Sequence, residues 1–172
     1  MGAGDPGERW AIPFVKALIR APAAPVILLQ RREKPDRYRG RLELPGGRVR
    51  MDESLVDAVA REVLEESGLT VRRVFPEGVE RSDCFGASAR ASIPLVVAEA
   101  MTPSGLVVGH YFACEAEGEP RATVEGSEHQ WLTLDELYRR VTEAPEDFAT
   151  LDRAALSALD RRRLRDWLDD PR

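Results

Sequence analysis

The chain has 172 residues, of which 43% are hydrophobic and 32% are charged. This balance is typical of a globular protein, and the length suits one domain better than two. The net charge of -5 argues against a protein that coats nucleic acid through a basic surface, although it allows a nucleotide substrate. We therefore expect residues 9–172 to form a single domain, preceded by a Gly-rich, disordered N-terminus at residues 1–8.

Cysteine usage and hydropathy indicate the compartment. Cys84 and Cys114 are far apart and lack the spacing of metal ligands, so we expect buried free thiols in a reducing environment. No apolar run approaches the roughly 20 residues of a membrane helix, and the N-terminus does not resemble a signal peptide. These features predict a cytoplasmic protein that binds neither membranes nor nucleic acid polymers.

The first half of the chain has the pattern of several strands followed by a helix. Apolar segments predict strands at Trp10–Ile19, Pro25–Gln30 and Arg41–Leu44. A stretch rich in Ala, Leu, Val, Glu and Arg then predicts a helix that begins after Ser54 and ends at Gly68. Ser54 and Asp57 have the spacing of a capping box, and Gly68 supplies the left-handed residue that closes many helices.

The second half of the chain predicts further strands and then two helices. Strands are expected at Leu69–Phe75, Leu95–Met101, Leu106–Glu115 and His129–Leu132. Residues 77–91 are hard to assign, although a strand around Cys84 fits them. The helices are expected at Leu134–Val141, capped from Thr133, and at Leu151–Leu168, which has one continuous apolar stripe. Together these elements predict an α/β fold with a mixed sheet and helices on its faces.

Three carboxylates lie on one side of the first predicted helix. Glu62, Glu65 and Glu66 stand at positions i, i+3 and i+4, which stack along a helix surface. Their like charges repel, so a sequence that keeps them together implies a compensating cation. Carboxylate oxygens suit Mg²⁺, with Mn²⁺ as a substitute, and the preceding Gly46-Gly47 pair lets the main chain approach a ligand closely.

The stretch from Gly47 to Leu69 reads Gly-x5-Glu-x7-Arg-Glu-Val-x-Glu-Glu-x-Gly-Leu. This pattern resembles the Nudix box, the signature of the Nudix hydrolases, and every fixed position of the box is filled. The resemblance implies an α/β/α sandwich around a mixed sheet. In this fold the box forms a loop, a helix and a second loop at one edge. The C-terminal helices would then cover the sheet.

The same resemblance implies roles for individual residues. The catalytic cations would bind to Glu62, Glu65, Glu66 and the carbonyl of Gly46. Arg61 and Glu53 would orient these carboxylates. The segment from Glu125 to Leu132 is similar to the Nudix segment from which a glutamate joins the metal site or acts as general base. Glu128 is our candidate there and Glu125 the substitute, so that either Glu62 or Glu128 would take the proton.

Charged and aromatic residues outside the box suggest substrate contacts. Arg31, Arg39 and Arg41 belong to a basic loop and could hold substrate phosphates, because guanidinium groups pair bidentately with phosphate oxygens. A solvated surface loop explains them equally well. Four aromatic residues could stack on a base, although core packing is the simpler explanation: Trp10, Tyr38, Phe85 and Tyr111.

The box resemblance implies a divalent-metal-dependent pyrophosphohydrolase that splits a phosphoanhydride bond in a nucleoside diphosphate linked to another group. A non-catalytic Nudix-fold nucleotide sensor is an alternative, but such proteins usually lose box carboxylates and this chain keeps all of them. An isomerase of isoprenoid diphosphates would need Cys84 to face a glutamate across the site. The sequence leaves open the substrate, the bond that is cleaved, the number of metal ions and whether two copies form a homodimer.

Overall fold

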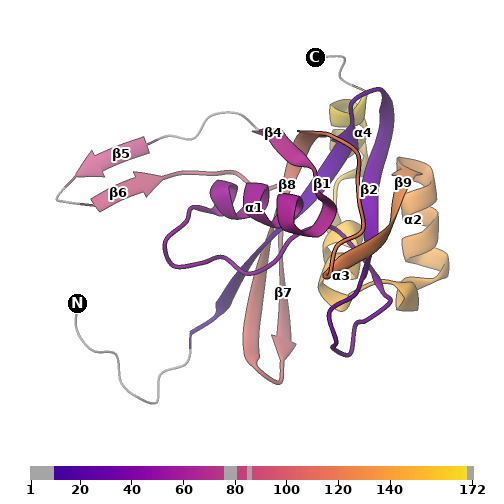
Figure 1. Cartoon of the computed structure of the whole chain (residues 1–172), viewed down its shortest axis with the longest axis horizontal. Helices are drawn as coiled ribbons and strands as arrows, with labels where there is room; N and C mark the ends of the chain where they lie inside the picture. The colour runs from indigo at the N-terminus through magenta and orange to yellow at the C-terminus, as the bar shows by residue number, and fades with distance from the viewer. Residues whose placement is uncertain (1–9, 76–80, 85–86, 170–172) are drawn as a thin grey trace.

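The computed structural model describes residues 10–75, 81–84 and 87–169 of the chain. The segment 1–8 that we expect to be disordered lies outside these residues, and so do Phe85 and the side chain of Cys84. The described part contains a seven-stranded sheet, a separate two-stranded hairpin and four α-helices (Figure 1). None of these helices is long and apolar enough to cross a membrane.

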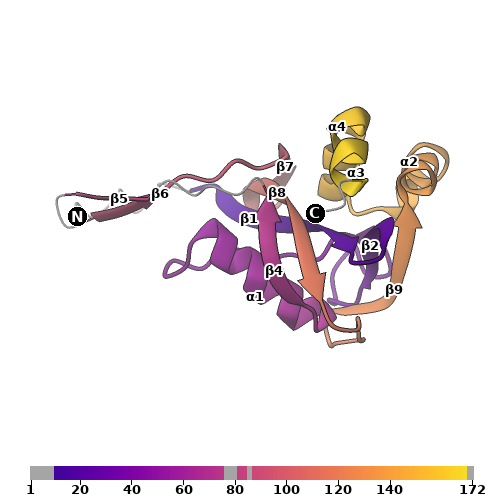
Figure 2. The ribbon, with the colours of Figure 1, turned by 90° about the horizontal axis from the view of Figure 1, so that it is seen from above.

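The strands and helices of the described residues have the following bounds. The sheet consists of β1 (Ile12–Ala21), β2 (Ala24–Arg32), β3 (Leu42–Glu43), β4 (Thr70–Phe75), β7 (Val96–Thr102), β8 (Gly105–Glu117) and β9 (Gly126–Thr133). The hairpin consists of β5 (Arg81–Cys84) and β6 (Ala87–Arg90), and it extends away from the sheet in Figures 1 and 2. The helices are α1 (Leu55–Ser67), α2 (Leu134–Glu143), α3 (Thr150–Ala158) and α4 (Arg161–Leu168), with a short 3-10 turn at Pro145–Asp147.

The sheet is mixed, as the sequence predicts. Its strands follow the order β3-β2-β1-β8-β4, while β7 also pairs with β8 and β9 also pairs with β2. β1 and β8 are parallel, and the other strand pairs of the sheet are antiparallel. α1 covers one face of the sheet, and α2, α3 and α4 lie on the other (Figure 2). The α/β/α sandwich with C-terminal helices is therefore confirmed.

Alternating side chains of β1 divide the protein into two cores. Val15, Ala17 and Ile19 pack on the α1 side together with Val59 and Val63. The side chain of Leu18 points to the opposite face, where the larger core is formed with residues of α2, α3 and α4. Each face of the sheet is apolar because a helix covers it, which is the arrangement expected for a sandwich of this kind.

The glycine turn before α1 is attached to the edge of β1. The backbone N–H of Val15 donates to the carbonyl of Gly47 at 2.9 Å, and the N–H of Ala17 donates to the carbonyl of Pro45 at 2.9 Å. Gly46 has a φ of 146° and lies so close to β1 that a Cβ would overlap the carbonyl oxygen of Val15. Only glycine fits there, so the sequence Gly46-Gly47 brings the main chain directly against β1.

The ends of α1 agree with the sequence prediction, but the C-terminal helix does not. Ser54 and Asp57 form the capping box, and Gly68 closes the helix with a φ of 74°. The predicted single helix at Leu151–Leu168 is wrong, because Leu159 is extended (φ -64°, ψ 134°) and divides it into α3 and α4. Asp160 then caps α4 by accepting hydrogen bonds from two backbone N–H groups, which an apolar periodicity alone does not reveal.

Candidate active site

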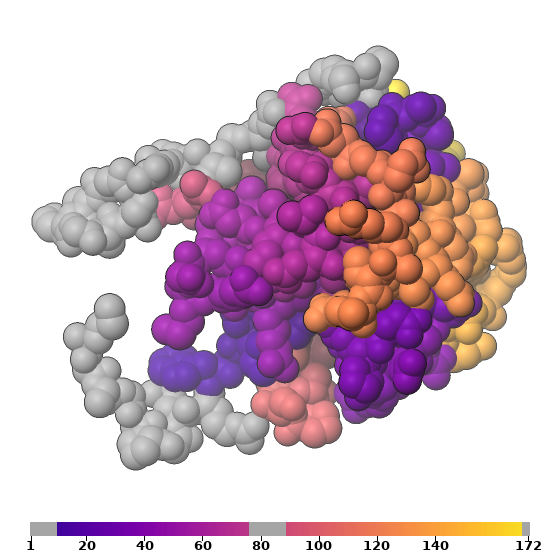
Figure 3. Space-filling view, viewed as in Figure 1, coloured from indigo at the N-terminus to yellow at the C-terminus, as the bar shows by residue number. Residues whose placement is uncertain are grey.

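Three carboxylates from two distant parts of the chain come together beside α1. Glu62 and Glu66 lie on successive turns of α1, and Glu125 comes from the loop before β9; one oxygen of each lies within 4.8 Å of the others. Figure 3 shows this loop and β9 lying directly against α1 and the loop after β2. Glu66 is fully buried and Glu62 is 5% exposed, so their negative charges need nearby compensation.

Glu66 is the most tightly held of the three. Its Oε2 accepts hydrogen bonds from Gln30 Nε2 at 2.6 Å and from the backbone N–H of Gly46 at 2.9 Å. Its Oε1 lies 3.0 Å from the ammonium group of Lys34. Burial raises the pKa of the Glu66 carboxyl group, although the ammonium group of Lys16 opposes this effect. The glycine turn thus positions both the backbone and the carboxylate at the site.

Arg61 fixes the position of Glu62. Its Nη1 donates to Glu62 Oε1 at 2.6 Å, and its Nη2 and Nε donate to the two carboxylate oxygens of Glu53 at 2.6 and 2.9 Å. These hydrogen bonds lower the pKa of Glu53 to about 2. A Cβ on Gly47 would lie 2.6 Å from the carboxyl carbon of Glu62, so the glycine also makes room for this side chain.

Glu125 is placed by a turn and by Lys34. The hydroxyl of Thr123 accepts hydrogen bonds from the backbone N–H groups of Glu125 and Gly126, and it donates to the carbonyl of Glu66 at 3.2 Å. This ties the loop to the last turn of α1. Lys34 Nζ lies 2.6 Å from Glu125 Oε2 and therefore bridges two of the three carboxylates. Lys34 belongs to the basic loop between β2 and β3, and the sequence alone does not indicate its contact with Glu66 or Glu125.

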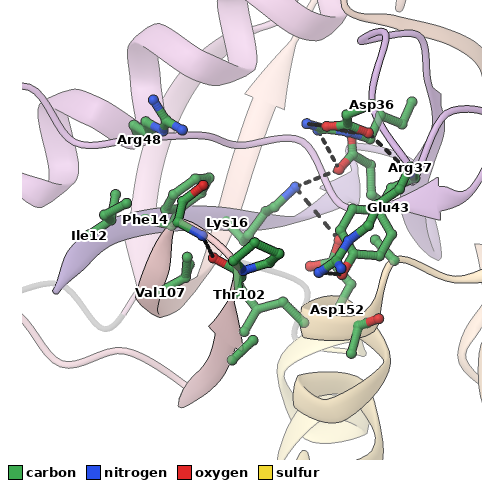
Figure 4. A pocket seen from close by; sticks show the side chains of 18 residues that line it. Ile12, Phe14, Lys16, Asp36, Arg37, Glu43, Arg48, Thr102, Val107 and Asp152 are labelled. Atoms are coloured by element: carbon green, nitrogen blue, oxygen red, sulfur yellow. Dashed lines mark hydrogen bonds and ion pairs between the residues drawn. The ribbon is translucent and has the colours of Figure 1, made fainter.

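A pocket of about 410 Å³ is lined by residues of β1 and by residues near the start of α3 (Figure 4). Its wall includes the apolar side chains of Phe14, Val107 and Leu151, and its polar residues include Lys16, Arg32, Glu43 and Asp152. Gly46 connects the pocket to the carboxylates. Its backbone N–H binds Glu66, and a Cβ at the same residue would overlap the side chain of Lys16, which lines the pocket. The pocket and the carboxylates therefore share a wall.

A buried polar network forms the floor of this pocket. Lys16 Nζ donates to Glu43 Oε2 at 3.0 Å and to the carbonyl of Leu44 at 2.8 Å, and it lies 3.6 Å from Asp152 Oδ2. The hydroxyl of Tyr111 donates to Asp152 Oδ1 at 2.8 Å. Burial opposes the charged form of Lys16, but Asp152 and Glu43 outweigh it and raise the pKa above the usual value.

Sequence reasoning missed this network. The available signal was Lys16 itself, a lone charge in the apolar run of a strand, at a position where the alternation of β1 points inward.

The described aromatic residues that the sequence suggested for base stacking differ in environment. Tyr38 lines the pocket, Tyr111 is fully buried in the core and Trp10 is exposed.

The residues at the carboxylate cluster fit a hard divalent cation. All three clustered side chains offer carboxylate oxygens, and the backbone of Gly46 lies beside them. Oxygen-only ligand sets suit Mg²⁺ or Mn²⁺ and disfavour the softer metals that Cys and His bind. Buried Gln30 Oε1, which has no hydrogen-bond partner in the described part of the chain, lies at the same place and adds a further oxygen.

Family comparison agrees with this site. The family model described as NUDIX domain matches residues 13–154, which is most of the chain and includes the helix and glycine turn that carry the carboxylates. The chain belongs to the Nudix family. It is 34% identical over 105 residues to a MutT-like protein of Streptomyces ambofaciens, and this match covers 60% of the chain and 55% of that relative. The chain thus spans about half the length of this curated relative.

Solved structures show the same Nudix fold. The crystal structure of a MutT protein from Methanosarcina mazei is 25% identical with a TM-score of 0.64, over 91% of this chain and 97% of the other. The crystal structure of a MutT NUDIX hydrolase from Burkholderia pseudomallei is 22% identical with a TM-score of 0.63, over 88% of this chain and all of the other.

The other predicted residues of the Nudix site lie further from the cluster. Glu65, whose side chain is 44% exposed, pairs with Arg61 at 3.0 Å and with Arg50 at 3.3 Å. Glu128, 66% exposed with a φ of 43°, pairs with Arg31 at 2.7 Å. It lies at a register shift between β9 and β2, and it is not part of the group of carboxylates within 4.8 Å of one another. The structure thus brings Glu125, rather than Glu65 or Glu128, next to Glu62 and Glu66.

The three arginines predicted to hold phosphate differ in their surroundings. Arg31 forms an ion pair with Glu128, and Arg39 forms one with Glu33 at 3.6 Å at the surface. Arg41 is half-buried and has no carboxylate within 4.0 Å among the residues that the structure describes. It does not line the pocket beside the carboxylates, but it lines a neighbouring one.

Proposed function

We propose that this Nudix protein hydrolyses a phosphoanhydride bond in a nucleoside diphosphate linked to another group, with Mg²⁺ or Mn²⁺ as cofactor. The observation that carries the proposal is the convergence of Glu62, Glu66 and Glu125 within 4.8 Å, next to a pocket of about 410 Å³. The carboxylates would hold the cation and the pocket would hold the nucleoside. A retained set of box carboxylates favours catalysis over a non-catalytic sensor.

Glu62, Glu66 and Glu125 would hold the cation, together with the backbone of Gly46. Glu65 stays a proposed ligand on the basis of the Nudix box, although its carboxylate pairs with arginines at the surface. The bound cation would neutralise charge on the diphosphate and activate a water molecule for attack on phosphorus.

Glu62 is our proposed general base. Arg61 holds its Oε1, so Oε2, which is directed toward the glycine turn, would serve either as a ligand or as the base. When Oε2 takes the proton of the attacking water, Glu66, Glu125 and the backbone of Gly46 would hold the cation. Glu128 fits this role less well, because its carboxylate is largely exposed and occupied by Arg31. Arg61 would act by positioning, since its guanidinium group holds Glu62 and Glu53 at the same time.

The pocket gives the nucleoside a place beside the reacting phosphates. Phe14 and Leu151 offer apolar surfaces for a flat ring, and Glu43 and Asp152 hold Lys16 in place at the floor of the pocket. Arg32 pairs with Glu43 at 3.2 Å and lines the same wall. Its guanidinium group can contact those phosphates of the substrate that extend out of the pocket. This arrangement would direct the diphosphate toward α1.

A substrate screen with the full chain tests the proposal. Nucleoside triphosphates, nucleotide sugars, ADP-ribose and dinucleoside polyphosphates are incubated with Mg²⁺, and released products are separated by chromatography. We expect hydrolysis of at least one class, and Glu66→Gln should lower kcat by at least about tenfold. The matched control is Glu143→Gln, which removes an exposed carboxylate on α2.

The screen also separates the enzyme from the sensor. A sensor would bind one of these nucleotides in a calorimetric titration and return it unchanged after long incubation with Mg²⁺. Such a result, or equal activity of the Glu66→Gln and Glu143→Gln variants, would refute the proposed reaction.

A further inference from the structure

A second pocket, of about 380 Å³, opens beside the first. Four residues line both pockets: Arg37, Tyr38, Ala100 and Thr150. The remaining wall of the second pocket is formed by Arg41, Met101, Pro145, Glu146, Phe148 and Arg153. A ligand in the first pocket can therefore extend into the second without leaving the protein surface.

Positive charge exceeds negative charge among the described residues that line the second pocket. Three guanidinium groups line it, from Arg37, Arg41 and Arg153, against the single carboxylate of Glu146. Among the described residues, none of these three arginines has a carboxylate within 4.0 Å. A cavity lined by charges of one sign concentrates ions of the opposite sign, so an anion is the ligand that this surface favours.

The neighbouring cations show that this imbalance is local. Four other basic residues lie at the end of β2 or in the charged loop between β2 and β3, and each one pairs with a carboxylate. The pairs are Arg31 with Glu128, Arg32 with Asp36, Lys34 with Glu66 and Arg39 with Glu33. Arg37 and Arg41 of the same loop face the second pocket and lack such a partner. The unpaired charges of this loop therefore coincide with the cavity.

Local structure holds the arginines at the pocket. Arg37 Nη2 donates to the hydroxyl of Tyr38 at 2.7 Å, and its guanidinium carbon lies 4.8 Å from the centre of the Tyr38 ring. The backbone N–H of Tyr38 donates to Asp36 Oδ1 at 2.9 Å, which fixes the turn. Arg153 lies in the first turn of α3, whose N-cap residue Ala149 provides no side-chain acceptor for the backbone N–H groups. This helix end adds to the positive potential.

The second pocket lies apart from the reacting phosphates. None of the described residues that surround the carboxylate cluster lines it, and neither do Lys16 and Glu43, which line the first pocket. The diphosphate that is to be cleaved must reach Glu62 and Glu66, so it cannot occupy this place at the same time. The anion that fits here belongs to the opposite end of the ligand.

We propose that the second pocket binds a further phosphate monoester on the nucleoside, so that the preferred substrates carry a phosphate in addition to the scissile diphosphate. This inference rests on the proposed function, because it assumes that the first pocket holds the nucleoside. Arg41 and Arg153 would each donate two hydrogen bonds to phosphate oxygens, and Arg37 would add charge from the stacked position on Tyr38.

Binding of monophosphates and bisphosphates tests this substrate class. Adenosine and guanosine 5′-monophosphates are compared with the corresponding 2′,5′- and 3′,5′-bisphosphates by calorimetric titration in the presence of Mg²⁺. These ligands contain no phosphoanhydride bond, so the enzyme does not consume them. We expect a bisphosphate to bind at least about tenfold more tightly than its monophosphate, which corresponds to about 1.4 kcal/mol.

Two variants locate the effect. The double variant Arg41→Ala, Arg153→Ala should bind the bisphosphate about as weakly as the monophosphate, with the affinity for the monophosphate unchanged. The control Arg139→Ala removes an exposed guanidinium group on α2 that lines neither pocket, and it should keep the preference. A preference that survives in the double variant would overturn the assignment to this pocket.

The remaining outcomes separate this inference from the proposed function. Equal affinity of the wild-type protein for monophosphates and bisphosphates overturns the inference, while the proposed hydrolysis stands if the screen shows turnover. Inorganic phosphate that binds by itself as tightly as the bisphosphate would make the pocket a free-anion site and would equally overturn it. If no nucleotide binds and none is hydrolysed, the proposed function fails and the inference fails with it.

Discussion

Lys34 offers a direct test of how the clustered carboxylates are neutralised. Its ammonium group lies 3.0 Å from Glu66 Oε1 and 2.6 Å from Glu125 Oε2. At an effective dielectric constant of about 20, each pair has a gross Coulomb attraction of about 5–6 kcal/mol. Desolvation and lost side-chain entropy cancel most of it, since the Lys34 side chain is 28% exposed. We expect Lys34→Met to destabilise the metal-free protein by about 1–3 kcal/mol.

This loss has two measurable consequences. The melting temperature of the metal-free protein should fall by about 2–12 °C, because about 2–4 °C corresponds to 1 kcal/mol in a protein of this size. Without the competing ammonium group, a divalent cation should bind the carboxylates more tightly, by at least about threefold or about 0.7 kcal/mol. Saturating Mn²⁺ should therefore raise the melting temperature of the variant more than that of the wild-type protein.

Circular dichroism measures the melting temperatures, and the signal of free Mn²⁺ in electron paramagnetic resonance measures the affinity. The matched control is Arg139→Met, which breaks an exposed ion pair with Glu143 and should leave both quantities nearly unchanged. If Lys34→Met and the control have the same melting temperature and the same Mn²⁺ affinity, Lys34 does not balance the carboxylates and the reasoning is wrong.

Three further changes probe the supports of the site. Gly47→Ala should lower kcat by at least about tenfold with little change in melting temperature, because the added methyl group displaces Glu62; full activity would contradict the close approach. Asp160→Ala should lower the melting temperature by about 2–4 °C, since an N-cap contributes about 1 kcal/mol, and an unchanged value would show that Asp160 does not stabilise α4. Arg61 lowers the pKa of Glu53 from 4.5 to about 2, so this carboxylate stabilises the protein fully above pH 4.5 and loses its effect as the pH falls toward 2. The difference in melting temperature between wild type and Glu53→Gln should therefore shrink over that range, and a constant difference would exclude this linkage.

Local features of the box were predictable because they depend on neighbouring residues. The capping box of Ser54 and Asp57 and the left-handed Gly68 each need only three or four consecutive positions, and the structure has both. The turn between β7 and β8 is also local, because Pro103 and Gly105 are turn-forming residues within four consecutive positions. The division of the last helix was not predictable in this way, because Leu159 continues the apolar stripe of a helix while its backbone is extended.

Which carboxylates converge was decided by the tertiary structure. Sequence spacing places Glu62, Glu65 and Glu66 together on a helix surface, but only two of them face the sheet side of α1. The third position is filled by Glu125, which the pairing of β9 with β2 brings next to the end of α1. A separation of 59 or more residues carries no periodicity, so spacing in the sequence could not decide whether Glu125 or Glu128 makes this contact.

The pockets, like the carboxylate cluster, depend on contacts between residues that are far apart in the sequence. The sequence by itself determined the strands, the box helix and the residue types that suit a divalent cation, because these depend on propensity, alternation and short-range spacing. The tertiary structure alone decided that Lys16, Glu43 and Asp152 share one buried network and that Arg41 meets Arg153 across a cavity. Such contacts join residues from separate elements, and only the packing of β1 and β3 against α3 brings their side chains within reach of one another.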